Sequence, residues 1–182
     1  MDLGRYRRLD LGLRSDNTPN LNLRMLTCVP HKMKTLILGY GNDSRNDDGV
    51  GWFVVSELAK LNLPGVTLST AHQLEVDVAE TACAYDQVVF VDAAIPESSA
   101  AWWTAPVVPG FESHAVAHYL TPGDVLGLSQ TLYGRMPRGV AFCIRGHDFN
   151  FGTTLSPETK LAAVAVVRQI TALVTKTELE TV

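Results

Sequence analysis

Residues 36–51 read LILGYGNDSRNDDGVG, and this stretch predicts a strand, an acidic turn and a helix in direct succession. The apolar run ends in Gly39-Tyr40-Gly41, and the turn that follows holds the carboxylates of Asp43, Asp47 and Asp48. In an open α/β sheet, ligands bind at such strand-to-helix turns, outside the carboxyl ends of the strands. We therefore expect this turn to carry function, either as oxygen ligands for a metal or as acid and base groups.

Apolar runs and helical patterns alternate along the rest of the chain, which predicts an α/β fold. Thr121-Pro122 and Ser156-Pro157 are typical helix starts, with an N-cap residue followed by proline. We expect strands at 35–38, 66–71, 88–91, 102–108 (an edge strand) and 139–144, and helices at 50–61, 75–85, 122–133 and from 157. The core face of the last helix is predicted to hold Leu161, Val164, Ala165, Ile170 and Leu173. The predicted fold is a three-layer α/β/α sandwich with a mostly parallel central sheet of about five strands.

Length and composition indicate one globular domain, which we place at residues 33–176 of the 182. Residues 1–32 lack a clear helical or strand period and are expected to be a disordered extension, and 177–182 a C-terminal tail. The formal net charge is −4, with the basic excess confined to residues 1–32. The acidic remainder argues against a nucleic-acid partner.

Neither a membrane segment nor a disulfide framework is expected. No apolar run approaches the roughly 18–20 residues that a membrane-spanning helix needs. The three cysteines are an odd number without a CxxC pair, and Cys83 and Cys143 lie in apolar segments. A reduced, cytoplasmic protein fits this pattern best.

Two common ligand-binding templates fail at the acidic turn. The glycines at 39 and 41 could begin a dinucleotide fingerprint, but its third glycine falls on Ser44, and an acidic loop would repel a pyrophosphate. A calcium loop that starts at Asp43 would have Asp48 at its glycine position and Val54 in place of the final glutamate. What remains is an acidic strand-to-helix turn.

Asp92 directly follows the apolar run 88–91, so we expect it at the same sheet edge as Asp48. A carboxylate there is costly unless it is paired, hydrogen-bonded or bound to a metal, and two of them predict a metal site. A third ligand should be a histidine, and His72, His114 and His118 could each reach this edge.

Acids at a helix start also satisfy free N–H groups, which is the simpler interpretation of Asp47. Asp43 is interpreted as a solvated carboxylate.

A set of motifs in fixed order resembles the hydrogenase maturation proteases, the endopeptidases that process nickel-iron hydrogenase large subunits. The motifs are Gly39-Tyr40-Gly41-Asn42 with Asp47-Asp48-Gly49-Val50-Gly51, Ala71-His72-Gln73-Leu74, Val89-Phe90-Val91-Asp92-Ala93, His118-Tyr119-Leu120-Thr121-Pro122 with Val125-Leu126, and Arg145-Gly146 with Phe149, Gly152 and Leu155-Ser156-Pro157. They run from Met33 to about Lys176. Residues 1–32 lie outside the resemblance.

The resemblance implies a protease that removes the C-terminal extension of a large-subunit precursor already loaded with nickel. Carried over by motif, Asp48, Asp92 and His118 are expected to bind this nickel, which the substrate supplies, and Asp48 and Asp92 are the expected catalytic residues. His118 is preferred to His114 because it stands directly before the Leu-Thr-Pro helix start. Either the metal polarises the scissile carbonyl while a carboxylate activates water, or nickel only docks the precursor and a carboxylate is the general base.

Two other functions are compatible with the same residues. One is a non-enzymatic maturation chaperone that reads nickel through the same three ligands, and the other is an α/β hydrolase of small amides. The expected partner is the hydrogenase large-subunit precursor, with no nucleic acid and no membrane. The particular hydrogenase, the cleaved bond and the oligomeric state stay open.

Overall fold

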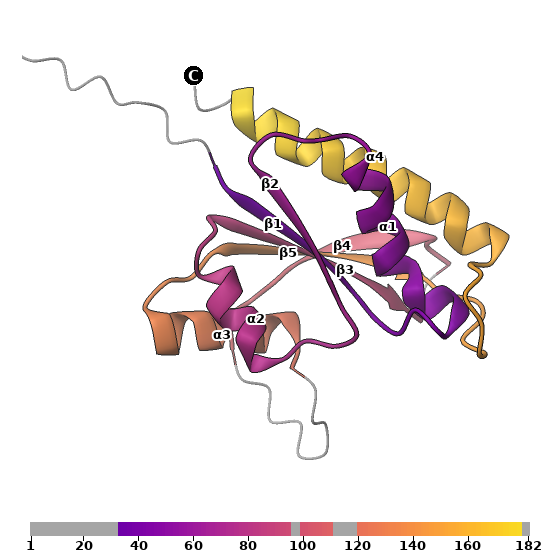
Figure 1. Ribbon diagram of the computed structural model, residues 1–182, viewed down its shortest axis with the longest axis horizontal. Helices are drawn as coiled ribbons and strands as arrows, with labels where there is room; N and C mark the ends of the chain where they lie inside the picture. The colour runs from indigo at the N-terminus through magenta and orange to yellow at the C-terminus, as the bar shows by residue number, and fades with distance from the viewer. Residues whose placement is uncertain (1–32, 96–98, 111–119, 180–182) are drawn as a thin grey trace, which may run out of the picture.

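The computed structural model describes residues 33–95, 99–110 and 120–179 of the chain. Its centre is one sheet of five strands in the order β2-β1-β3-β5-β4 (Figure 1). The strands are β1 (Thr35–Tyr40), β2 (Val66–Ala71), β3 (Gln87–Ala94), β4 (Trp102–Pro106) and β5 (Arg138–Arg145). Strand β4 pairs with β5 in the antiparallel direction at one edge, and the other pairs are parallel. The predicted mostly parallel sheet and its proline-flanked edge strand are confirmed.

Helices cover both faces of the sheet and complete the three layers. They are η1 (Asn46–Gly49), α1 (Val50–Ala59), α2 (Val76–Ala82), α3 (Pro122–Tyr133) and α4 (Pro157–Leu179). Helices α1 and α4 pack on one face, and α2 and α3 pack on the other (Figure 1). Among the described residues, no helix is long and apolar enough to span a membrane.

The central strand β3 shows why the sheet needs both helical layers. Its side chains alternate between the two cores: Val89 and Val91 face α1 and α4, whereas Val88 and Phe90 face α2 and α3. All four are fully buried, and each such side chain contributes about 1.5–3 kcal/mol on burial. A continuous run of β-branched and aromatic residues therefore gives a central parallel strand.

The start of α3 follows its sequence signals closely. The Thr121 hydroxyl accepts a hydrogen bond from the Asp124 amide at 3.2 Å, and the Asp124 carboxylate accepts one from the Thr121 amide at 2.8 Å, which completes a capping box. The helix ends at Gly134, whose φ of 67° is the left-handed conformation that glycine adopts without strain. Both ends lie where the sequence predicted them.

Helix α4 differs from its prediction in length and in phase. It continues to Leu179, beyond the domain end expected at 176, and Leu161, predicted to face the core, is 75 % exposed. Ile170 is fully buried and Leu173 packs against the core, as predicted. The buried side chains begin at Thr159 and continue at helical spacing through Ala163 and Val166 to Ile170. Hydrogen bonds at Thr159 set this phase, and small alanines let the helix pack closely on the sheet.

Candidate active site

The fold places a crevice between β1 and β3. From β1 the chain passes through α1 to β2 on one side, and from β2 it returns through α2 to β3 on the other side of β1. Helices α1 and α2 lie on opposite faces of the sheet. Their connections therefore diverge at the carboxyl ends of β1 and β3, which is where open α/β sheets bind ligands.

Glycines bring the start of α1 against this edge of the sheet. A Cβ added at Gly39 would lie 2.1 Å from the Gly51 carbonyl oxygen, and one at Gly51 would lie 2.7 Å from the Val91 carbonyl oxygen. No other residue fits at these contacts without movement of the backbone. The two glycine pairs of the opening motif therefore set the distance between strand and helix, and they do not form a phosphate-binding loop.

Gly41 lies between the two carboxylates that the sequence singled out. Its φ is 121°, a conformation that side chains rarely allow. A Cβ there would lie 2.1 Å from the Asp48 carbonyl oxygen and 3.4 Å from Asp92 Oδ1. The absence of a side chain at this position lets the Asp48 turn approach Asp92.

Asp48 and Asp92 line one pocket of about 420 Å³, which we call the active-site pocket. The other residues that line it are Tyr40, Gly41, Asn42, His72, Gln73, Leu74 and Leu120. The prediction that Asp48 and Asp92 lie at one sheet edge is confirmed, and His72 borders the same crevice as expected. Tyr40, one residue beyond the paired Gly39 and Val91, is the part of the pocket that sequence reasoning missed, although its strand position places it beside Asp92.

Asp92 is partly buried near the end of β3. It lies inside the strand, paired in register with Cys143, because β3 continues to Ala94 and does not stop before Asp92. Burial raises the pKa of Asp92 to about 7, hydrogen bonds from the Ala93 amide and the Tyr40 hydroxyl oppose this rise, and the charge of Asp48 adds to it. Asp92 can therefore exchange a proton near neutral pH.

Asp48 is fixed by its own turn. Its Oδ2 accepts a hydrogen bond from the Asn42 amide at 3.0 Å. Behind it, Trp52 Nε1 donates to the Gly41 carbonyl at 2.9 Å, and the indole packs against the His72 ring with the ring centres 5.5 Å apart. Helix α1, β1 and the residue after β2 are thus joined around the pocket.

Asp47 is fully buried and does not cap its own helix, so the helix-cap interpretation is wrong. Its carboxylate accepts hydrogen bonds from the amides of His147, Asp148 and Ser156 at 2.7–2.9 Å and from the hydroxyls of Ser156 and Thr159 at 2.7 and 2.9 Å. Burial raises the pKa of Asp47, but hydrogen bonds led by the His147 and Ser156 amides outweigh it and lower the pKa to about 2. Asp47 therefore ties the acidic turn to the β5–α4 loop.

Two neighbours of Asp47 strengthen this tie. Arg45 donates from Nη2 to the Phe149 carbonyl at 2.9 Å, and Asn46 Nδ2 donates to Asp148 Oδ2 at 2.8 Å. Sequence reasoning missed all three residues as anchors. Their partners lie about a hundred positions away, and local spacing carries no signal for such contacts.

The predicted third ligand, His118, and its alternative, His114, lie outside the described residues. Within the described residues, no group of three or more His, Cys, Asp or Glu side chains is arranged to hold a metal. Asp48 and Asp92 lie in the same pocket with His72 on its rim.

Several solved structures of hydrogenase maturation proteases are similar to this chain. The chain is similar to the [NiFe] hydrogenase maturation protease HycI from Thermococcus kodakarensis KOD1, with 26% identity and a TM-score of 0.65 over 79% of this chain and 94% of that one. It is also similar to the hydrogenase maturating endopeptidase HybD from E. coli (16% identity, TM-score 0.64, 80% and 94% covered) and to HybD from Thermococcus kodakarensis (22%, 0.58, 78% and 99%). No protein-family model and no curated protein sequence matches the chain. The resemblance that the ordered motifs predicted is confirmed.

Proposed function

We propose that this chain, a structural relative of the hydrogenase maturation proteases, is an endopeptidase that removes the C-terminal extension of a nickel-loaded hydrogenase large-subunit precursor. The observation that carries the proposal is the convergence of Asp48 and Asp92 on one pocket at the carboxyl edge of a sheet with this fold. The similar proteins from Thermococcus kodakarensis and E. coli are hydrogenase maturation enzymes by name.

In this proposal the nickel is part of the substrate. Asp48 and Asp92 supply carboxylate oxygens toward it, with His118 as the imidazole ligand. A metal held by so few protein groups keeps positions for the ligands that the precursor brings. The site therefore distinguishes a loaded precursor from an empty one. When bound, the nickel would either polarise the scissile carbonyl or serve only to dock the precursor.

The chain's own residues supply proton transfer. Either Asp48 or Asp92 acts as the general base that takes a proton from water and returns one to the leaving amine. Tyr40 and the Ala93 amide orient the Asp92 carboxylate. Asp48 is oriented by the Asn42 amide, and two adjacent carboxylates with different surroundings are a common arrangement for acid and base roles.

The test is incubation of the purified protein with nickel-loaded and nickel-free precursor, with the products identified by mass. We expect loss of one defined C-terminal peptide from the loaded precursor only. A chaperone would leave the mass unchanged, and a hydrolase of small amides would cleave a model amide without any precursor.

Asp48→Asn is the matching site variant, because it keeps the shape of the side chain and removes its charge. We expect it to abolish processing of the loaded precursor. Glu80→Gln, an equivalent charge removal on an exposed residue of α2, should process normally. Normal cleavage by Asp48→Asn would show that the site is assigned to the wrong residues.

A further inference from the structure

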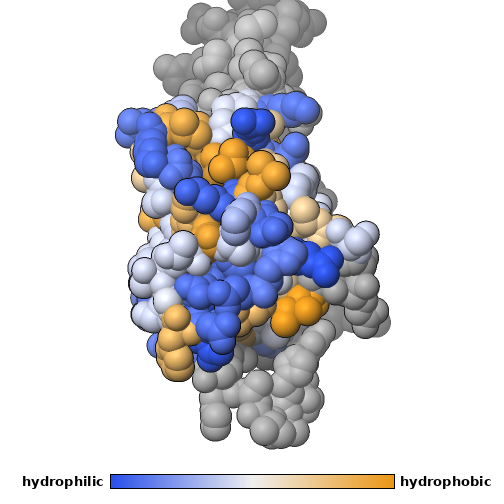
Figure 2. Space-filling view, turned by 90° about the vertical axis from the view of Figure 1, so that its right-hand side faces the viewer, coloured by the Kyte–Doolittle hydropathy of each residue, from blue (hydrophilic) through white to orange (hydrophobic). Residues whose placement is uncertain are grey.

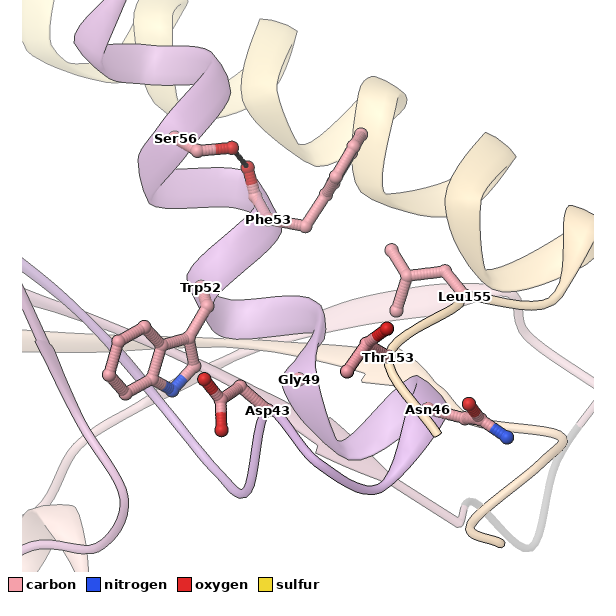
Figure 3. Close-up of a pocket in the computed structure, with 8 residues that line it drawn as sticks. All are labelled: Asp43, Asn46, Gly49, Trp52, Phe53, Ser56, Thr153 and Leu155. Carbon is pink, nitrogen blue, oxygen red and sulfur yellow. Dashed lines mark hydrogen bonds between the residues drawn. The ribbon is translucent and has the colours of Figure 1, made fainter. Parts of the chain in front are cut away.

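A second pocket lies beside the acidic turn, and neither the fold nor the proposed catalysis uses it. We call it the lateral pocket; its volume is about 390 Å³. The residues that line it are Asp43, Asn46, Gly49, Trp52, Phe53, Ser56, Thr153 and Leu155. Figure 3 shows the Asp43 carboxylate beside the Trp52 indole, with Thr153 and Leu155 across from them.

Asp43 is the charged residue among those that line the lateral pocket, and Lys160 lies over the ring of another lining residue, Phe53. Asp43 is exposed, and within the described residues its carboxylate makes only a 3.4 Å hydrogen bond with the Ser44 hydroxyl and no ion pair. Lys160 Nζ lies 5.9 Å from the centre of the Phe53 ring. A second cation is repelled by Lys160 and attracted to Asp43, where an aromatic ring is also present.

Trp52 connects the lateral pocket to the active-site pocket. Its ring lines the lateral pocket, while its Nε1 donates to the Gly41 carbonyl and its ring contacts His72. Gly41 and His72 both line the active-site pocket. Trp52 therefore adjoins both pockets.

The surface around this edge favours recognition by charge. Figure 2 shows the face at the carboxyl edge of the sheet, where hydrophobic side chains form small separate groups among hydrophilic ones. A partner that bound mainly by apolar contact would need a wider continuous patch than these groups offer. An exposed carboxylate beside an indole instead matches one long basic side chain.

We propose that the lateral pocket is a substrate subsite for an arginine or lysine side chain of the precursor. Asp43 pairs with the cationic group, and Trp52 packs against its aliphatic stem. The subsite rests on the proposed function, since its occupant belongs to the chain that is cut in the active-site pocket. The precursor would then be recognised in two ways, by its nickel in the active-site pocket and by a basic side chain in the lateral pocket.

The experiment measures steady-state cleavage of nickel-loaded precursor by the wild-type protein, Asp43→Asn and the distant control Glu80→Gln. Asp43→Asn removes an exposed charge pair and keeps the Trp52 contact, so it should raise KM about 1.5- to fivefold. The loss should fall on KM and not on kcat. Raising the ionic strength should increase KM for the wild-type protein more than for Asp43→Asn. Glu80→Gln should behave as wild type.

The occupant is identified by replacing each lysine or arginine that flanks the cleaved bond with glutamine, one at a time. For the precursor that lacks the occupant, Asp43→Asn should cause no further rise in KM. If the same precursor position carries glutamate, Asp43→Lys should restore cleavage that the wild-type protein performs poorly. If the wild-type protein leaves the loaded precursor uncut, the proposed function and the subsite both fail. If it cuts the precursor and Asp43→Asn matches Glu80→Gln, the subsite alone fails.

Discussion

Replacing Asp47 with asparagine tests the tie between the acidic turn and the β5–α4 loop. Oδ1 of Asp47 accepts from the Ser156 amide, and Oδ2 accepts from the His147 and Asp148 amides and the Ser156 and Thr159 hydroxyls. Asparagine keeps one acceptor oxygen and presents an NH₂ group to the other donors. At least the Ser156 amide then loses its partner and faces another donor.

The magnitude follows from the pKa and from the lost bond. The pKa of Asp47 is about 2 instead of 3.8, which corresponds to ~2 kcal/mol of stability from the charged form. An unsatisfied buried amide adds about 1–3 kcal/mol. We therefore expect Asp47→Asn to lower the free energy of unfolding by about 3 kcal/mol at pH 7 and Tm by roughly 6–12 °C.

The assay is urea unfolding followed by circular dichroism between pH 7 and pH 3. Because the folded-state pKa lies below the unfolded one, the contribution of the charge is complete above about pH 4 and declines as the pH falls toward 2. The difference between the variant and the wild-type protein should shrink in that range. Asp43→Asn, on an exposed carboxylate of the same turn, should stay within about 0.5 kcal/mol of wild type. An equally small effect for Asp47→Asn would refute this account of the tie.

Three further changes test other parts of the site and the fold. Asp92→Asn should stabilise the metal-free protein by about 1–3 kcal/mol at pH 8 and not at pH 4. The pKa of Asp92 is raised from 3.8 to about 7 on folding, so the stability of the wild-type protein falls as the pH rises between these values. An equal difference between variant and wild type at both pH values would contradict this. Gly41→Ala places a Cβ 2.1 Å from the Asp48 carbonyl oxygen. Precursor cleavage should therefore fall at least about tenfold, and Tm should decrease. Unchanged cleavage kinetics would show that the turn can adapt to the added methyl group. Thr121→Ala removes the N-cap of α3 and should lower the unfolding free energy by about 1–2 kcal/mol without changing KM.

The sequence predicted those features that depend on local chemistry. Proline and the capping pair at Thr121 define the start of α3, and the apolar run before Asp92 identifies a central strand whose carboxyl end carries a functional group. Parallel strands bring such ends to one edge, so the sequence places Asp48 and Asp92 together, as the pocket confirms.

Features that depend on distant contacts could not be predicted in this way. The acidic pair Asp47-Asp48 looks uniform in sequence, yet one carboxylate is fully buried and the other faces the pocket. The partners of Asp47 come from a loop that spacing cannot assign. For the same reason the phase of α4 was wrong at Leu161, since Thr159 and its bonds to the acidic turn orient the helix.

The Asp47 tie also constrains when the acidic turn becomes anchored during synthesis. The acidic turn is made early, but the groups that hold it lie between 100 and 112 residues further along the chain. Until β5 and the start of α4 have left the ribosome, Asp47 has none of these partners, and its turn has no fixed position relative to β3. A chain that lacks β5 and the start of α4 therefore lacks every one of these hydrogen-bond donors to the Asp47 carboxylate, and we expect its acidic turn to be unanchored.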